Sequence, residues 1–84
     1  MCYVYILLMD NGKLYAGFTH DLRRRLKEHK IGKDTTTKKY LPVELIFYEA
    51  YKNEEDARRR EKYFKTNKGK TVLKIMLNKT LGSF

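Results

Sequence analysis

The sequence predicts an α+β domain, in which a small antiparallel sheet of three strands is flanked by helices in the order strand, strand, helix, strand, helix, helix. Two observations support this prediction. Segments 3–9, 13–19 and 43–51 are rich in β-branched and aromatic residues, as strands are. Apolar residues recur every three or four positions in 22–30 and 57–64, which is typical of helices that bury one face. Segment 3–9 is apolar on both faces, so we place it at the centre of the sheet.

The loop of the first hairpin decides which side chains share a face. An Asn-Gly pair between two apolar runs is a strong hairpin signal. A two-residue turn would put Tyr5 and Tyr15 on opposite faces of the sheet. A three-residue loop, 10–12, with Gly12 at positive φ in a G1 bulge, sets Tyr5 opposite Gly17 and both tyrosines on one face. A site that uses both tyrosines requires the second register, and we predict it.

The first helix turns one arginine and one histidine toward the sheet. Thr19 or Asp21 caps it. At about 100° per residue, His29 lies in line with the buried Leu22, and Arg25 lies at the edge of the same stripe. These side chains also have ordinary explanations, because an arginine can lay its stem along a core and a histidine is favoured at a helix end.

The second helix carries one inward carboxylate. The acids at 54–56 belong to its first turn, where they offset the helix dipole. Ala57 and Phe64 define the buried stripe, and Glu61 lies about 40° from Ala57. A buried carboxylate needs a cation beside it, and the sequence leaves open whether this is a metal ion or Arg25.

Turn residues predict the remaining boundaries. Gly32 ends the first helix and Asn53 caps the second. We expect the second helix to break at Gly69 and a last short helix to cover 71–77, with its apolar residues facing inward. The tail, 78–84, is expected to fray.

Composition restricts the class of protein. The chain has 84 residues, enough for the single domain 1–84, and a formal charge of +9, which favours polyanions such as nucleic acid. Its longest apolar run, 3–9, is far too short to span a bilayer, and no helix has the broad apolar face of a membrane-surface helix. Its one cysteine, Cys2, cannot form an internal disulfide. We therefore expect a soluble cytoplasmic protein.

A polar, basic loop covers residues 32–42, and a solvated mobile loop is one explanation of it. Its hydroxyl and ammonium groups also suit contacts to backbone phosphates. The residues expected to bind nucleic acid are Lys33, Thr35, Thr36, Thr37, Lys38 and Lys39 of this loop, together with Lys68 and Lys70.

The order and spacing of five residues resemble a known family. Tyr5 in Tyr-Val-Tyr and Tyr15 in Tyr-Ala-Gly stand where the GIY-YIG nucleases carry their two named tyrosines. Arg25 and His29 fall at the family's places on the following helix, and Glu61 at that of its single metal-binding glutamate. The likeness covers nearly the whole chain. It is closest to the small stand-alone members, and the chain is also similar to the N-terminal nuclease domain of the bacterial excinuclease.

The resemblance implies a divalent-metal-dependent DNA endonuclease that selects structure rather than sequence, in repair, recombination or processing of DNA. Glu61 would hold one Mg²⁺ or Mn²⁺ ion, and Arg25 would balance charge on the phosphate. Tyr5 would orient or deprotonate the attacking water, with Tyr15 placing the water or the phosphate. His29 is the alternative base, since its pKa suits neutral pH better.

Other points stay open. Asn67 and Asn78 compete for the place of the family's late phosphate-binding asparagine. The expected partner is DNA, including branched or single-stranded forms, with a further protein as a source of specificity. The alternatives to an enzyme are a basic nucleic-acid-binding module with little or no hydrolysis and an accessory protein of a larger assembly. The five intact site positions favour the enzyme, because a binding module would need only the lysines.

Overall fold

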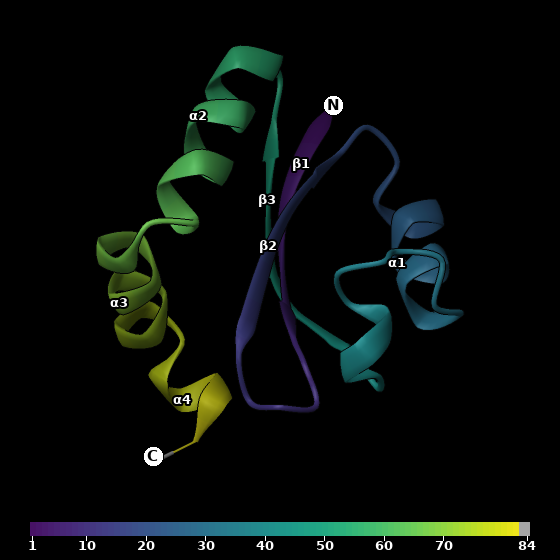
Figure 1. The fold of residues 1–84 in the computed structure, drawn as a ribbon. Coiled ribbons are helices and arrows are strands. Elements are labelled where there is room, and N and C mark those ends of the chain that lie inside the picture. The colour runs from purple at the N-terminus through teal and green to yellow at the C-terminus, as the bar shows by residue number, and fades with distance from the viewer. Residues whose placement is uncertain (83–84) are drawn as a thin grey trace.

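The computed structural model describes residues 1–82 of the chain (Figure 1). Its elements confirm the predicted α+β architecture and its order, with a 3₁₀ turn before the third strand and a one-turn helix at the end. They are β1 (Cys2–Leu8), β2 (Leu14–Thr19), α1 (Leu22–Lys30), the 3₁₀ turn (Lys38–Tyr40), β3 (Glu44–Tyr51), α2 (Glu54–Phe64), α3 (Asn67–Met76) and α4 (Asn78–Leu81). None of the helices in residues 1–82 is long and apolar enough to cross a membrane.

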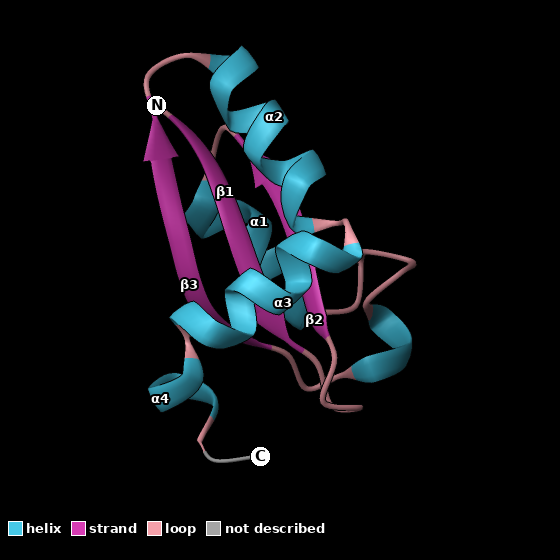
Figure 2. Ribbon diagram, turned by 90° about the vertical axis from the view of Figure 1, so that its left-hand side faces the viewer, coloured by secondary structure: helices cyan, strands magenta, loops and turns pink. Residues whose placement is uncertain are grey.

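The three strands form one antiparallel sheet in the order β2-β1-β3, so β1 is central as predicted. Helices α2 and α3 cover one face of this sheet, and α1 with the 3₁₀ turn lies on the other (Figures 1 and 2). Because successive side chains of a strand point to opposite faces, β1 supplies both layers. Val4 and Ile6 pack with Phe64 and Leu73 on the α2–α3 side. Tyr5 and its neighbours pack toward α1.

The hairpin has the three-residue loop. The Met9 N–H donates to the Lys13 carbonyl at 3.0 Å, and the Gly12 N–H donates to the Met9 carbonyl at 2.9 Å. Gly12 has a φ of 81°, which glycine adopts without strain. Tyr5 is opposite Gly17, and the predicted register is confirmed.

The helix caps are confirmed, and one predicted break is wrong. Asp21 and Asn53 cap α1 and α2 with their side chains. The break after α2 lies at Thr66, whose hydroxyl accepts from the Gly69 N–H at 3.0 Å and so starts α3. Gly69 lies inside the first turn of α3, where a Cβ would stand 1.9 Å from the carbonyl oxygen of Tyr63. This glycine therefore allows a close approach of two backbones and does not end a helix.

The C-terminal prediction is wrong in part. Leu73 and Leu77 are buried, but Ile75 is 70% exposed and Met76 is 46% exposed, so the apolar residues of this segment do not all face inward. Helical spacing allows only one face of α3 to meet the sheet. The segment expected to fray contains α4, and residues 83–84 lie outside the part that the structure describes.

Candidate active site

Two tyrosines and a histidine from three elements meet on the α1 side of the sheet. The Tyr5 hydroxyl of β1 lies 2.8 Å from Nε2 of His29 on α1. The Tyr15 ring of β2 lies 5.4 Å from the His29 ring and 6.4 Å from the Tyr5 ring, between centroids. Tyr5 and His29 are almost fully buried, whereas Tyr15 is partly exposed. The cluster thus has a closed side at Tyr5 and an open side at Tyr15.

Gly17 creates the space for this cluster. A Cβ at Gly17 would lie 2.3 Å from Cζ of Tyr5 and 2.4 Å from its hydroxyl oxygen. The Tyr5 ring therefore lies flush on the backbone of β2. The glycine therefore marks the close approach of a side chain to the strand.

The second ring nitrogen of His29 contacts the loop that follows α1. Its Nδ1 lies 2.8 Å from Oγ1 of Thr37, a fully buried residue. Asp34 organises that loop, because its Oδ1 accepts from the backbone N–H of Thr36 at 2.9 Å and of Thr37 at 3.0 Å. The Thr37 hydroxyl also donates to Oδ1 of Asp34, at 3.5 Å.

Arg25 completes the same network from the side of α1. Its Nη2 lies 2.6 Å from Oδ2 of Asp34, and its Nη1 lies 3.1 Å from Oε1 of Glu28. Its side chain is 28% exposed, so the guanidinium keeps a face toward solvent. The sequence left open an ion pair between Arg25 and Glu61. Within residues 1–82, Arg25 pairs with Asp34 and Glu28 and not with Glu61.

Burial and charge fix the protonation states of this site. Burial raises the pKa of the Tyr5 hydroxyl to about 12, an effect that the neighbouring Arg25 partly offsets. Burial also raises the pKa of Tyr15, and it lowers that of His29, with Arg25 lowering it further. Burial opposes the ionisation of Asp34, but its bonds to the Thr37 and Thr36 N–H groups bring its pKa below the ordinary value. At neutral pH the tyrosines and His29 are therefore uncharged beside an ionised Asp34.

Glu61 approaches from the opposite layer. It lies on α2, its side chain is 15% exposed, and its Oε2 lies 2.9 Å from Nζ of Lys65. The charge of Lys65 acts on the Tyr15 hydroxyl, so the ion pair lies near the open side of the cluster, by the edge strand β2. A single carboxylate suits a hard divalent cation that keeps most of its water. Lys65 would have to turn away for such an ion to bind.

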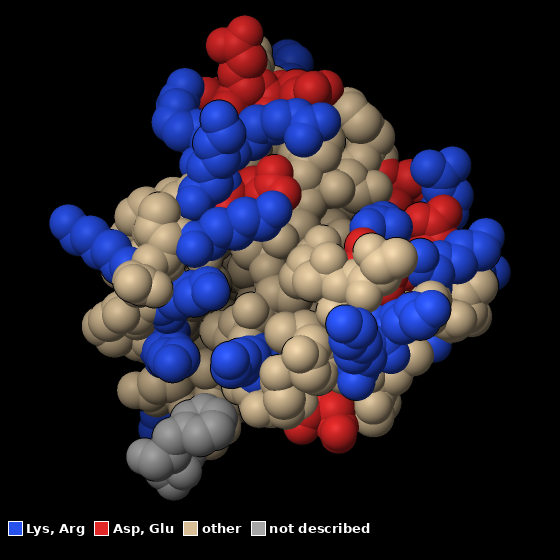
Figure 3. Space-filling model, viewed as in Figure 1, with Lys and Arg blue, Asp and Glu red and all other residues tan. Residues whose placement is uncertain are grey.

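Most of the predicted nucleic-acid-binding residues lie at the surface. Figure 3 shows one group of Lys and Arg side chains over α2 and α3, another over α1 and the loop after it, and uncharged surface between them. Thr37 differs, because it is fully buried against His29 and cannot meet a phosphate directly. The exposed members are Lys33, Thr35, Thr36, Lys38, Lys39, Lys68 and Lys70.

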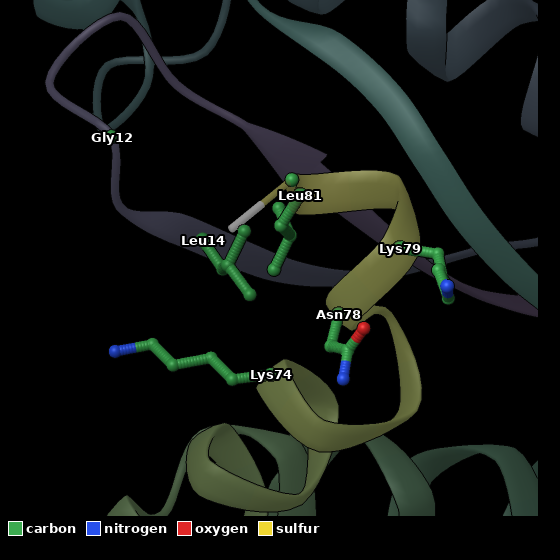
Figure 4. Close-up of a pocket in the computed structure, with 7 residues that line it drawn as sticks. Gly12, Leu14, Lys74, Asn78, Lys79 and Leu81 are labelled. Atoms are coloured by element: carbon green, nitrogen blue, oxygen red, sulfur yellow. The ribbon is translucent and has the colours of Figure 1, made fainter. Parts of the chain in front are cut away.

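The two candidate asparagines lie elsewhere. Asn67 is exposed at the start of α3. Asn78 lines a hollow of about 780 Å³ between the β1–β2 loop and the C-terminal helices, with Leu14, Lys74 and Leu81 around it (Figure 4). Leu14 belongs to the core on the α2–α3 side, so this hollow lies across the sheet from the tyrosines. Neither asparagine takes part in the hydrogen bonds of the cluster.

Sequence reasoning missed the structural roles of Asp34, Thr37 and Lys65. Asp34 is the only acid between Gly32 and Pro42, in an otherwise basic loop, and that isolation was a usable signal. Lys65 stands four residues after Glu61, the helical spacing for an ion pair. Thr37 gave no signal of its own, since its role depends on how the loop folds back onto α1.

Comparisons with known proteins find relatives of the chain by sequence and by fold. Residues 1–74 match the model of the GIY-YIG catalytic domain. A UPF0213 protein of Streptococcus agalactiae is 42% identical over 64 residues, which cover 75% of this chain and 73% of that protein. One from Pediococcus acidilactici is 37% identical over 79 residues, covering 90% and 81%. The solution NMR structure of a UPF0213 protein from Bacillus halodurans has 35% identity and a TM-score of 0.59, covering 90% of this chain and 85% of that one.

Proposed function

Because the chain belongs to the GIY-YIG catalytic domain family, we propose that it is a divalent-metal-dependent endonuclease that hydrolyses phosphodiester bonds in DNA. One observation carries this proposal. Tyr5, Tyr15, Arg25 and His29 come from three elements and lie in one network. Glu61 on α2 pairs with Lys65, whose charge acts on Tyr15. A protein that only bound nucleic acid would need the lysines but not this combination of two tyrosines, an arginine, a histidine and a glutamate.

Arg25 is the group that meets the phosphate charge. A guanidinium stays protonated under all working conditions, and the bonds of Arg25 to Asp34 and Glu28 fix its position in advance. Donors held in place before the reaction stabilise charge that develops on phosphate oxygens. Tyr15, on the open side, is placed to hold the phosphate or the water.

Glu61 is the proposed ligand of one Mg²⁺ or Mn²⁺ ion. A divalent ion there would polarise the phosphate and stabilise the leaving oxygen. In its absence Lys65 neutralises the carboxylate. Tyr5 orients the attacking water, and the proton acceptor is Tyr5 or His29.

The surrounding lysines and arginines supply sequence-independent binding to the DNA backbone. The basis for this is the charge of +9 and the two exposed basic groups on either side of the uncharged surface (Figure 3). Backbone contacts of this kind position a nucleic acid without reading its sequence. We therefore propose that the protein selects the structure of DNA rather than its sequence, with branched and single-stranded DNA among the substrates to test, in DNA repair, recombination or processing.

The test is a nicking assay on supercoiled plasmid and on branched DNA with Mg²⁺ or Mn²⁺, comparing the wild type with Glu61→Ala. We expect the variant to lose cleavage by about 100-fold or more while it keeps its fold and its affinity for DNA. Glu55→Ala is the matched control, because Glu55 is an exposed acid at the other end of α2. Cleavage by Glu61→Ala at the wild-type rate would remove Glu61 from the metal role. A wild type that binds DNA but never cuts it would favour the binding module.

A further inference from the structure

Four side chains form a continuous hydrogen-bonded line from a loop into the candidate active site. Asp34 accepts from the Thr37 hydroxyl at 3.5 Å, Thr37 lies 2.8 Å from Nδ1 of His29, and Nε2 of His29 lies 2.8 Å from the Tyr5 hydroxyl. The last three residues have at most 1% of their surface exposed. Bulk water therefore does not compete for these bonds in the free protein, and an attacking water would have to reach the Tyr5 oxygen from the open side of the cluster, at Tyr15.

The charge of Asp34 gives the line its direction. An ionised carboxylate only accepts hydrogen bonds, so the 3.5 Å contact of Thr37 with Asp34 is a bond only when the hydroxyl hydrogen points at Asp34. In that arrangement the Thr37 oxygen accepts from His29, and Nδ1 carries the ring hydrogen. Nε2 is left with its lone pair, and Tyr5 donates to it. In a histidine, the bond at one nitrogen thus determines the proton on the other.

We propose that Asp34 and Thr37 are positioning residues that hold His29 in the Nδ1–H tautomer, so that Nε2 accepts the proton that Tyr5 relays from the attacking water. This inference rests on the proposed function. As the water oxygen bonds to phosphorus, one of its protons passes to the Tyr5 oxygen and the proton of Tyr5 passes to His29. The bond from phosphorus to the leaving oxygen breaks, and that oxygen keeps the electron pair and takes a proton from solvent water. Tyr5 ends neutral, and the His29 imidazolium later releases its proton to solvent.

The environment favours a relay over a phenolate formed in advance. Burial raises the pKa of Tyr5 to about 12 and lowers that of His29, so both groups are neutral before the reaction. In a relay Tyr5 gains one proton as it gives up another and need not become an anion. The other charged and titratable groups around His29 are Arg25, Glu28, Asp34 and the Tyr15 ring.

Thr37→Val tests the proposal, because valine has the shape of threonine and cannot bond to Nδ1, whereas Thr37→Ser keeps the hydroxyl. The first measurement is the ¹⁵N spectrum of His29 in the free protein. We expect the Nδ1–H tautomer in the wild type and in Thr37→Ser, and a mixture in Thr37→Val. The second is cleavage, which we expect to fall about 10- to 100-fold in Thr37→Val and to recover in Thr37→Ser, with unchanged DNA affinity.

An Nε2–H tautomer in the wild type would overturn the proposal, and so would a Thr37→Val protein with the wild-type tautomer and rate. If Thr37→Val fails to fold, the wild-type spectrum still tests the proposal, because it reports the tautomer of His29 directly. Because the spectrum needs no DNA or metal, it also separates this proposal from the proposed function. A protein with the expected tautomer that cuts no DNA would refute the nuclease and leave the tautomer assignment standing.

A different set of side chains carries a second inference at the start of α2. Sγ of Cys2 lies 3.6 Å from Nδ1 of His20, and Nε2 of His20 lies 3.1 Å from Oε1 of Glu54. One ligand atom from each of the three lies within 4.8 Å of the others. They come from the start of β1, the residue after β2 and the first turn of α2.

We infer that this trio binds a zinc-like ion. Zinc–sulfur and zinc–nitrogen bonds of about 2.3 and 2.0 Å at a tetrahedral angle separate sulfur from nitrogen by about 3.5 Å, close to the 3.6 Å between Cys2 and His20. Glu54 is exposed and can turn to supply the third ligand, which leaves a fourth position for water. Thiolate and imidazole select zinc over magnesium, so this site is distinct in chemistry from Glu61.

Titration with Zn²⁺, and with Co²⁺ followed by its absorption spectrum, tests this site without DNA. We expect one ion per chain with a thiolate-to-cobalt band, a rise in the unfolding temperature, and an affinity at least about tenfold lower in Cys2→Ser. His20→Gln should weaken binding likewise, and Glu61→Ala should not. Equal affinity in Cys2→Ser and the wild type, or no thiolate band, would overturn the inference.

Discussion

Replacing Gly17 with alanine would place a methyl group where the Tyr5 ring already lies. The new carbon would stand 2.3 Å from Cζ of Tyr5, whereas nonbonded carbons rest about 3.5 to 4.0 Å apart. The ring must therefore move by about 1.2 to 1.7 Å. Such a movement would disturb the contacts of Tyr5, because its side chain is 1% exposed and its hydroxyl lies 2.8 Å from Nε2 of His29.

We expect Gly17→Ala to lower the free energy of unfolding by about 1.5 to 4.5 kcal/mol. Overpacking contributes about 1 to 3 kcal/mol, and loss of the bond between Tyr5 and His29 contributes about 0.5 to 1.5 kcal/mol. Urea unfolding measures the total. Cleavage should fall as well, because the phenol would leave its place beside the histidine.

A double-mutant cycle separates this collision from a general effect of alanine in a strand. In a Tyr5→Leu background the methyl group meets a shorter side chain, so Gly17→Ala should be at least about 1 kcal/mol less destabilising there. The reasoning would be refuted if Gly17→Ala unfolded within about 0.5 kcal/mol of the wild type, or if its effect were equal in both backgrounds.

Three further predictions follow from charge. Lys65→Met should raise the affinity of Glu61 for Mg²⁺ about two- to fivefold, because a salt bridge with an exposed lysine is worth up to about 1 kcal/mol. Calorimetry with Mg²⁺ would measure the affinity. An unchanged affinity would show that Lys65 does not compete with the ion for Glu61. If about five phosphates are neutralised, log K for DNA should fall with log salt at a slope of about 4 to 5, and a flat response would contradict backbone binding. Burial lowers the pKa of His29, so below about pH 6.5 the unfolded chain takes up a proton that the folded chain does not. The free energy of unfolding should therefore decrease as the pH is lowered below about 6.5. His29→Gln should lack this fall, as chemical denaturation at pH 7 and pH 5 would show; an equal fall in the variant would assign the effect to other groups.

The parts of the fold that depend on short-range chemistry could be predicted from the sequence. The Asn-Gly pair locates the hairpin, but its register was chosen because a site with both tyrosines requires them on one face. The second helix start follows from Asn53, and the first from Asp21, one of two capping candidates. Thr66 and Gly69 both mark a helix boundary in the sequence. The boundary lies at Thr66, which caps α3, whereas Gly69 allows a backbone contact with Tyr63 that exists only in the folded chain.

The candidate site was predictable as a set of residues but not as a network. Helical spacing aims Arg25 and His29 at the sheet, and the structure places both there. Their partners Asp34 and Thr37 lie in a loop without a repeating pattern, so no periodicity shows which of its side chains turn inward.

The loop between α1 and β3 has two sides, and its length matters to both. Lys38 and Lys39 face solvent, where phosphates would bind, while Asp34 and Thr37 hold Arg25 and His29. Surface loops ordinarily tolerate inserted residues. One added residue between Asp34 and Thr37 would instead separate a carboxylate from the two backbone N–H groups it caps and carry the threonine away from the imidazole. This short segment therefore acts as a spacer of fixed length. Replacing an outer lysine would change a contact to phosphate, whereas changing the number of residues between the lysines and the helix would take the site itself apart.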